Sequence, residues 1–248
     1  MTDVKLPRAV ILAAGSGTRF LRSGGIGFKQ LSPFKGEPVI ARLVRQIEES
    51  MAFSGITVVL GSNSNCADSI RAILAGRQVN YTLNHDAERD NNLLSYRVGV
   101  EGLDEPILLI EADCVVESTD LSIMVSGLQP DEIRWANIGD AKDFDYGGLI
   151  ETDPETGQGI GVDVLAESEF TAFKISSRQG VKMFGLSAFG AGALANYRQH
   201  IDALSDPYDK YFHYIANQSP GLFQLTTRRI SNQSFSFNTI SELCNVDD

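Results

Sequence analysis

The sequence is short of positive charge. Lysine and arginine total 21 residues against 32 aspartates and glutamates, which gives a formal net charge of −11. Nucleic acids and anionic lipid surfaces are bound through many Lys and Arg contacts, so neither is an expected partner. A small anionic substrate is compatible with this chain only where a local cluster of positive charge or a metal ion neutralises it.

Cysteine is also scarce, and long apolar runs are missing. Cys66, Cys114 and Cys244 are odd in number and lack CxxC spacing, so neither a disulfide framework nor a zinc site is indicated. We therefore expect a reducing, cytoplasmic location. The N-terminal residues lack a signal-peptide layout, and their apolar run is too short to cross a bilayer, so no membrane association is expected.

Short apolar runs alternate with helical patterns through the first half of the chain. The helical patterns comprise apolar positions between residues 40 and 51 and the segments 67–74 and 93–103. The runs predict buried strands at residues 8–14, 56–60, 79–83 and 107–110. This β-α-β order predicts an α/β fold with a doubly wound, mostly parallel, Rossmann-like sheet.

The second half of the chain is less regular. Its patterns predict helices at residues 191–204 and 208–218, and strands at residues 133–138, 148–151, 170–175 and 183–189. We see no linker, so residues 1–248 are expected to form one domain. Its NTP-binding half would be residues 8–130 and its acceptor-binding half residues 131–248.

A glycine-containing loop directly follows the first predicted strand. It runs through Leu12, Ala13, Ala14, Gly15, Ser16, Gly17 and Thr18 to Arg19, and Lys29 lies ten residues beyond Arg19. Glycines let the backbone N–H groups approach phosphate oxygens, and Arg19 can grip such oxygens in bidentate fashion. The loop is neither a dinucleotide fingerprint nor a Walker A loop. A tight turn without a ligand is an equal alternative for the loop alone, but Arg19, Lys29 and an acid at a strand end together favour phosphate binding.

Two acids end the fourth predicted strand. Asp113 comes at the carboxyl end, where open α/β sheets bind ligands, and Glu111 lies two residues earlier. Mg²⁺ at nucleotide sites is commonly held by one or two carboxylates, so Asp113 is a candidate ligand and Glu111 a second one. The alternative is that Asp113 only caps a turn or helix.

The loop and the residues after it resemble the signature of sugar-nucleotide pyrophosphorylases and related nucleotidyltransferases. The resemblance rests on residues 12–20 together with Phe-Lys-Gln-Leu at 28–31 and Gly-Glu-Pro-Val-Ile at 36–40. It implies the nucleotide-diphospho-sugar transferase type of fold, with the loop around the NTP phosphates. It also implies that Arg19 binds the leaving pyrophosphate, Lys29 stabilises the α-phosphate and Asp113 binds Mg²⁺.

Two further segments refine the resemblance. Asn91-Asn92-Leu93-Leu94-Ser95 is similar to an element of phosphocholine cytidylyltransferases, which makes Asn92 and Ser95 candidate nucleotide contacts; by itself it is a helix cap. Near the C-terminus, the superfamily carries a second metal-binding Asp followed by Thr or Ser. This chain has Asn238-Thr239 there, and an Asn oxygen can still ligate Mg²⁺.

Aromatic and acidic residues suggest where an acceptor could bind. Aromatic rings can surround a quaternary ammonium group, and nearby carboxylates can meet a cation. Core packing and a solvated loop are the competing explanations for the same residues. The candidates are Trp135, Asp143, Asp145, Tyr146 and Tyr211.

Together these features predict a Mg²⁺-dependent nucleotidyltransferase that uses an NTP and a small phosphate or phosphonate acceptor. The first hypothesis is a cytidylyltransferase that transfers CMP from CTP to phosphocholine or 2-aminoethylphosphonate. The alternatives are a sugar-1-phosphate nucleotidyltransferase using UTP, dTTP or GTP, and a degenerate nucleotide-binding regulatory protein. The sequence does not give the oligomeric state.

Overall fold

The computed structural model describes residues 5–218 and 221–244. Within these residues, nine strands form the central sheet. Seven follow the order β10-β9-β11-β6-β1-β4-β5, while β8 pairs with β11 and β12 pairs with β8. These strands are β1 (Arg8–Ala13), β4 (Gly55–Gly61), β5 (Val79–Asn84), β6 (Ile107–Glu111), β8 (Glu132–Asp140), β9 (Gly147–Thr152), β10 (Gly159–Leu165), β11 (Gln179–Phe189) and β12 (Gln224–Arg229). Two small two-stranded sheets pair β2 (Pro33–Phe34) with β3 (Glu37–Pro38) and β7 (Cys114–Val115) with β13 (Phe235–Ser236).

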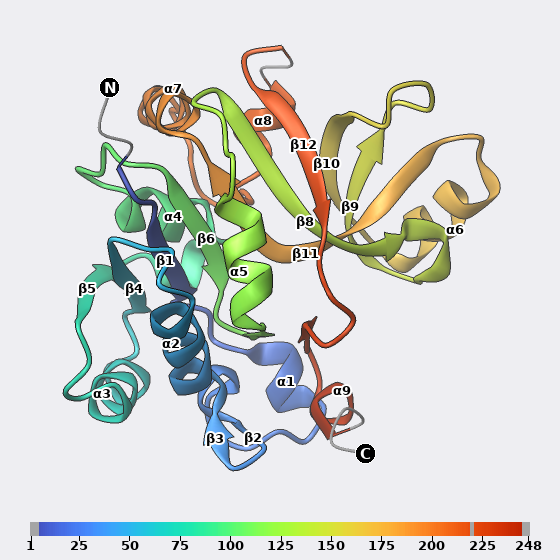
Figure 1. Ribbon diagram of the computed structural model, residues 1–248. Helices are drawn as coiled ribbons and strands as arrows, with labels where there is room; N and C mark the ends of the chain where they lie inside the picture. The colour runs from blue at the N-terminus through green and yellow to red at the C-terminus, as the bar shows by residue number, and fades with distance from the viewer. Residues whose placement is uncertain (1–4, 219–220, 245–248) are drawn as a thin grey trace.

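Helices cover both faces of the central sheet (Figure 1). In the described residues they are α1 (Thr18–Arg22), α2 (Val39–Ser50), α3 (Ser64–Ile73), α4 (Leu93–Gly99), α5 (Ser118–Val125), α6 (Glu167–Ile175), α7 (Ala191–Asp202), α8 (Tyr214–Gln218) and α9 (Ile240–Cys244). Single 3-10 turns are η1 (Lys29–Leu31), η2 (Ala87–Arg89) and η3 (Ala141–Asp143). Every helix in the described part of the chain is too short or too polar to cross a membrane.

Strand β1 shows why the sheet is doubly wound. Its side chains alternate between faces. Ala9, Ile11 and Ala13 pack against α2, α3 and α5, while Val10 and Leu12 pack against α4 and the side of α7. Both sets are buried, which explains the continuous apolar run. Strands β1, β4, β5 and β6 are mutually parallel, so the predicted α/β class and its parallel first half are confirmed.

The second half extends this sheet with mainly antiparallel strands. Strand β11 is antiparallel to β6, β8 and β9, and β12 runs parallel to β8. The long β11 thus joins the parallel sheet to the β9–β10 extension, which lies to the right in Figure 1. At the other end of the molecule, the chain returns through β13 and α9 to pack beside α1, where Phe237 meets Phe20.

Two of the predicted elements in the second half are wrong. Residues 170–175 form part of helix α6 rather than a strand, because Phe170 and Phe173 lie one turn apart and pack together in a small core. The Glu169 carboxylate also accepts the backbone N–H of Ala166 at the start of this helix, 2.8 Å away. Only residues 214–218 of the predicted helix 208–218 are helical. Strands β10 and β12 and helix α5 were not predicted.

Candidate active site

The candidate site lies where β1 and β6 end, next to the glycine loop. Gly17 adopts φ 65°, in the left-handed region that favours glycine, and a Cβ there would come 3.2 Å from the Cβ of Lys29. Leu12 and Ala13 are buried in the sheet, and Ala14 is half-buried. Gly15, Ser16, Thr18 and Arg19 are exposed, so the accessible part of the loop begins at Gly15.

Lys29 lies at the centre of the site. It starts the η1 turn, and its side chain is 11% exposed. Its ammonium group forms an ion pair with the Asp113 carboxylate and donates to Asn238 Oδ1 at 3.3 Å, while its Nζ lies 5.3 Å from the centre of the Phe237 ring. Three residues predicted from distant sequence segments are therefore brought together by the fold.

The Glu111 carboxyl group lies beside this cluster, at the end of β6. Burial is the main cause that raises its pKa, to about 7, and the negative charge of Asp113 adds to the effect. Lys29, Arg19 and Lys182 act in the opposite direction, so all three cations are close enough to influence Glu111. A carboxyl group whose pKa lies near neutral pH, within a cluster of charged groups, is a frequent feature of functional sites.

Asn92 reaches the same cluster from the start of α4. Its backbone has φ 112°, which is unusual for a residue other than glycine. Its side-chain amide donates to Glu111 Oε1 at 3.4 Å and accepts the backbone N–H of Phe212 at 2.7 Å. The strained backbone is thus held by contacts on both sides, and it directs the amide group of Asn92 toward the end of β6.

Ser95 is placed differently from Asn92. It is buried, its hydroxyl donates to Asp90 Oδ2 at 2.6 Å, and that hydroxyl accepts the amide of Asn84 at 2.9 Å. Asp90 also accepts the backbone N–H groups of Leu94 and Ser95. The helix is therefore capped by Asp90, which sequence reasoning missed although Asp is a favoured cap residue. Ser95 supports this cap, and its hydroxyl is already engaged within the protein.

The side-chain oxygens of Asp113 and Asn238 are of the kind that binds a magnesium ion. A carboxylate and an amide oxygen converge on one cation, the Lys29 ammonium group. Hard oxygen donors of this kind are the ligands Mg²⁺ uses, often only one or two from the protein with the rest from phosphates and water. Across residues 5–218 and 221–244, His, Cys, Asp and Glu side chains form no metal-binding group of three or more. Such a pair fits a metal shared with a nucleotide.

Helix α9 links Asn238 to the second half of the molecule. The Glu242 carboxylate accepts the backbone N–H groups of Asn238 and Thr239, the latter at 3.3 Å. Its other oxygen accepts the hydroxyl of Tyr146 at 2.8 Å. Sequence reasoning did not single out Glu242, although Thr239 and Glu242 have the spacing of a capping box. Tyr146 is therefore the acceptor candidate that the fold connects to the Lys29 cluster.

The other acceptor candidates lie elsewhere. Trp135 is 0% exposed and packs against Phe189 and Phe212 in the core, so the prediction that it contacts an acceptor is corrected. Tyr211 is partly exposed and stacks on His213. Asp143 and Asp145 are both exposed, and Asp145 pairs with Lys174 at 2.6 Å. Core packing therefore explains Trp135, whereas Tyr211, Asp143 and Asp145 lie at the surface.

The chain matches the model of a known protein family. The model of a family described as the MobA-like NTP transferase domain matches residues 9–138. A CMP-5'-(3-aminopropyl)phosphonate synthase from Streptomyces rubellomurinus is 32% identical over 114 residues, which are 44% of this chain and 18% of that protein. The chain thus spans less than a fifth of the length of this relative.

Solved structures share the fold across nearly the whole chain. A CTP:phosphocholine cytidylyltransferase from Streptococcus pneumoniae has a TM-score of 0.75 at 15% identity, with 97% of each chain covered. An inositol-1-phosphate CTP transferase from T. maritima has a TM-score of 0.72 at 12% identity, with 100% of this chain and 98% of that chain covered. A UDP-glucose pyrophosphorylase complexed with UDP-glucose has a TM-score of 0.72 at 15% identity, with 97% of each chain covered. Identities this low support the fold alone.

Proposed function

Because the chain belongs to the MobA-like NTP transferase family, we propose that it is a magnesium-dependent cytidylyltransferase. It would transfer CMP from CTP to a small phosphate or phosphonate acceptor of the phosphocholine or 2-aminoethylphosphonate type and release pyrophosphate. The observation that carries the proposal is the convergence of Lys29, Asp113 and Asn238 beside the glycine loop. These are the charges and oxygen ligands that nucleotidyl transfer needs.

Cytosine is the favoured base for two reasons. The relative of 32% identity is named for a CMP-phosphonate product, and two of the structural neighbours are named for CTP. In addition, the Asn92 side chain uses one donor and one acceptor within the protein, which leaves one of each for a base. A cytosine edge offers an amino group and a carbonyl group that match this pair.

The transfer itself follows from these side chains. An oxygen of the acceptor would attack the α-phosphorus in line, and the bond to the bridging oxygen of pyrophosphate would break. A phosphate monoester is mostly ionised at pH 7, because its second pKa is about 6, so this nucleophile needs no general base. Positioning and neutralisation of charge then provide most of the catalysis.

Each group in the cluster would have one role. Lys29 would exchange its contacts with Asp113 and Asn238 for an oxygen of the α-phosphate, and Arg19 with the backbone N–H groups from Gly15 onward would hold the pyrophosphate. Asp113 and Asn238 would hold Mg²⁺, which supplies positive charge to the phosphates when bound. The loop residues Gly15 to Thr18 and Asn92 would contact the NTP, with Ser95 as support for Asn92.

The proposal extends to the organisation of the chain. Residues 1–248 would form one nucleotidyltransferase domain, with NTP bound mainly by residues 8–130 and the acceptor mainly by residues 131–248. The division between parallel strands β1, β4, β5 and β6 and the later antiparallel strands supports it. A cytoplasmic location is part of the proposal, supported by three free cysteines in the described residues.

A pyrophosphate-release screen tests the proposed function. CTP, UTP, dTTP, ATP and GTP would each be combined with Mg²⁺ and with phosphocholine, 2-aminoethylphosphonate or glucose-1-phosphate. We expect the fastest release with CTP and an amine-bearing phosphate or phosphonate. Release with none of these combinations would count against transfer to this class of acceptor.

A sugar-1-phosphate nucleotidyltransferase is the second candidate. The observation that favours it is the UDP-glucose pyrophosphorylase whose fold covers 97% of this chain. The same screen separates the two candidates, because this one requires UTP, dTTP or GTP together with glucose-1-phosphate. A clear preference for such a pair would replace the cytidylyltransferase proposal.

A further inference from the structure

Strand β11 carries a third cation close to the charged cluster. Lys182 is half-buried, and its ammonium group donates to the backbone carbonyl of Tyr146 at 2.8 Å. We propose that Lys182 binds the anionic phosphonate or phosphate group of the acceptor. This inference rests on the proposed function, since it assigns the acceptor side of the same site.

The ammonium group of Lys182 lies among three aromatic rings. Its Nζ lies 5.9 Å from the ring centre of Phe144, 6.0 Å from that of Tyr146 and 5.8 Å from that of Phe170. An ammonium group has three N–H donors, and within the described residues one of them is used, by Tyr146. Two donors on an ordered ammonium group are thus left for a ligand. Surface lysines, by contrast, lose conformational entropy when they become ordered on a ligand.

Gly147 leaves the space that this ammonium group occupies. It has φ 102°, and a Cβ at this position would collide with Lys182 Nζ. A residue with a side chain would therefore be strained and would also push the ammonium group away. Lys182 pairs with Leu149 in the β9–β11 register, and its ammonium group reaches back to the glycine at the start of β9. Both Gly147 and Tyr146 belong to the segment that reaches Glu242 and, through it, Asn238.

The charges around the site indicate why an anionic acceptor would need a cation such as Lys182. Transfer brings an anionic acceptor against the α-phosphate, and Glu111 and Asp113 would repel it. In the proposed roles, Lys29 and Arg19 are occupied by the NTP. Lys182 is the remaining cation that acts on Glu111, and the Glu111 and Glu242 carboxylates favour its charged form. Burial lowers its pKa to about 8, which still leaves the ammonium form predominant at neutral pH.

Substitution of Lys182 separates binding of the acceptor from binding of the nucleotide. Lys182→Met keeps the stem and removes the charge, Lys182→Arg keeps the charge, and Lys174→Met removes a lysine from an ion pair in the same half as a matched control. Two quantities are measured for each variant. The first is the dissociation constant for CTP with Mg²⁺ in the absence of acceptor, by calorimetry. The second is the Michaelis constant for the acceptor during turnover, with 2-aminoethylphosphonate as the acceptor.

We expect Lys182→Met to raise this Michaelis constant by about 10- to 100-fold, since a charge-assisted hydrogen bond is lost. The affinity for CTP should stay within about twofold, Lys182→Arg should recover part of the loss, and Lys174→Met should match the wild type. An unchanged Michaelis constant in Lys182→Met would overturn the proposal. An equal loss of CTP affinity would also overturn it, because Lys182 would then bind the nucleotide or only brace β9 against β11.

A binding experiment without turnover keeps this inference separate from the proposed function. The wild type and Lys182→Met are titrated with 2-aminoethylphosphonate and with inorganic phosphate alone. If the wild type binds either anion and Lys182→Met binds it at least about tenfold more weakly, Lys182 is an anion site even where no nucleotide transfer occurs. Equal binding by the two proteins, or no binding by the wild type, would contradict the inference.

Discussion

At the scale of single residues, the unusual feature of this protein is that one ammonium group holds both proposed metal ligands. Lys29 contacts Asp113 and Asn238, which brings the two oxygens together on one cation. The contact also offsets the negative charge of Asp113 and reduces its repulsion of Glu111. In the proposed function, a bound metal ion would contact the oxygens of Asp113 and Asn238 in place of Lys29, and a phosphate oxygen would contact Lys29.

Replacing Lys29 tests its role at the α-phosphate. Lys29→Ala should lower kcat by about 10²–10³-fold, the usual cost of losing one donor that stabilises developing charge. The affinity for NTP should change far less, because Arg19 and the loop remain. Steady-state kinetics and equilibrium binding of NTP measure the two effects. Lys35→Ala, at an exposed position, is the control, and a near-normal kcat in Lys29→Ala would remove Lys29 from the reaction.

The proposed metal ligands make a second prediction. Asn238→Asp should bind Mn²⁺ more tightly than the wild type and remain active, since a carboxylate is the stronger ligand for such cations. Asp113→Ala should lose Mg²⁺-dependent activity. Titration with Mn²⁺, followed by electron paramagnetic resonance of the free ion, measures binding without turnover. An Asp113→Ala protein with wild-type Mn²⁺ affinity and Mg²⁺ dependence would show that the metal is held elsewhere.

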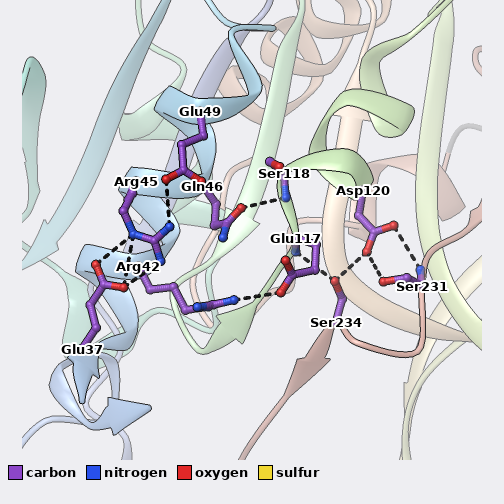
Figure 2. Close-up of polar contacts among 10 residues, drawn as sticks. All are labelled: Glu37, Arg42, Arg45, Gln46, Glu49, Glu117, Ser118, Asp120, Ser231 and Ser234. Carbon is purple, nitrogen blue, oxygen red and sulfur yellow. Dashed lines mark hydrogen bonds and ion pairs between the residues drawn. The ribbon is translucent and has the colours of Figure 1, made fainter. Parts of the chain in front are cut away.

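At the scale of elements, the position of Asn238 depends on how its segment is tied to α5. Figure 2 shows the Asp120 carboxylate accepting the hydroxyls of Ser231 and Ser234 and the backbone N–H of Ser231. Ser234 in turn accepts the backbone N–H of Glu117 at 3.1 Å. Asp120 and Ser234 are both buried, so water has little access to their hydrogen bond. The network fixes the chain just before β13 and Asn238.

Loss of this network should lower the free energy of unfolding. Asp120→Ala leaves the buried hydroxyl of Ser234 and the half-buried donors of Ser231 without their acceptor, which costs about 1–3 kcal/mol in the free energy of unfolding. Asp68→Ala removes an exposed carboxylate from the ion pair with Arg71 and should change stability by less than roughly 0.5 kcal/mol. Urea unfolding of both variants measures the difference. Equal stability of Asp120→Ala and the wild type would contradict the structural role assigned to the network.

The elements also show which parts of the structure the sequence could predict. Buried parallel strands such as β1 have a pattern that follows from burial on both faces, and strand ends locate Asp113 and Asn238. The predicted strand at residues 170–175 was wrong because two phenylalanines three residues apart in a short segment fit either a strand or a helix. The prediction for Trp135 failed because its burial depends on Phe189 and Phe212, which lie far away in the chain. The contacts of Glu242 and Lys182 with Tyr146 were missed because Tyr146 lies far away in the chain, whereas the capping contact of Glu242 with Thr239 is local.

At the scale of the whole molecule, a chain of net charge −11 brings three cations close to one carboxyl group, that of Glu111. Arg19 and Lys29 come from the first half, and Lys182 comes from the second half across the joint made by β11. The cluster around Glu111 therefore draws on both halves of the sheet. In the proposed function, the NTP and the acceptor would meet at this joint, and each would face a cation from a different half.

Identification of the product by ³¹P nuclear magnetic resonance tests the proposed transfer most directly. The wild type is incubated with CTP, Mg²⁺ and 2-aminoethylphosphonate, with Lys29→Ala as the control. We predict two coupled signals from a phosphonate–phosphate anhydride, together with one equivalent of pyrophosphate, and neither at a comparable rate with Lys29→Ala. Absence of the anhydride would contradict the proposed function, above all where the same enzyme forms a nucleotide sugar from UTP or dTTP and glucose-1-phosphate.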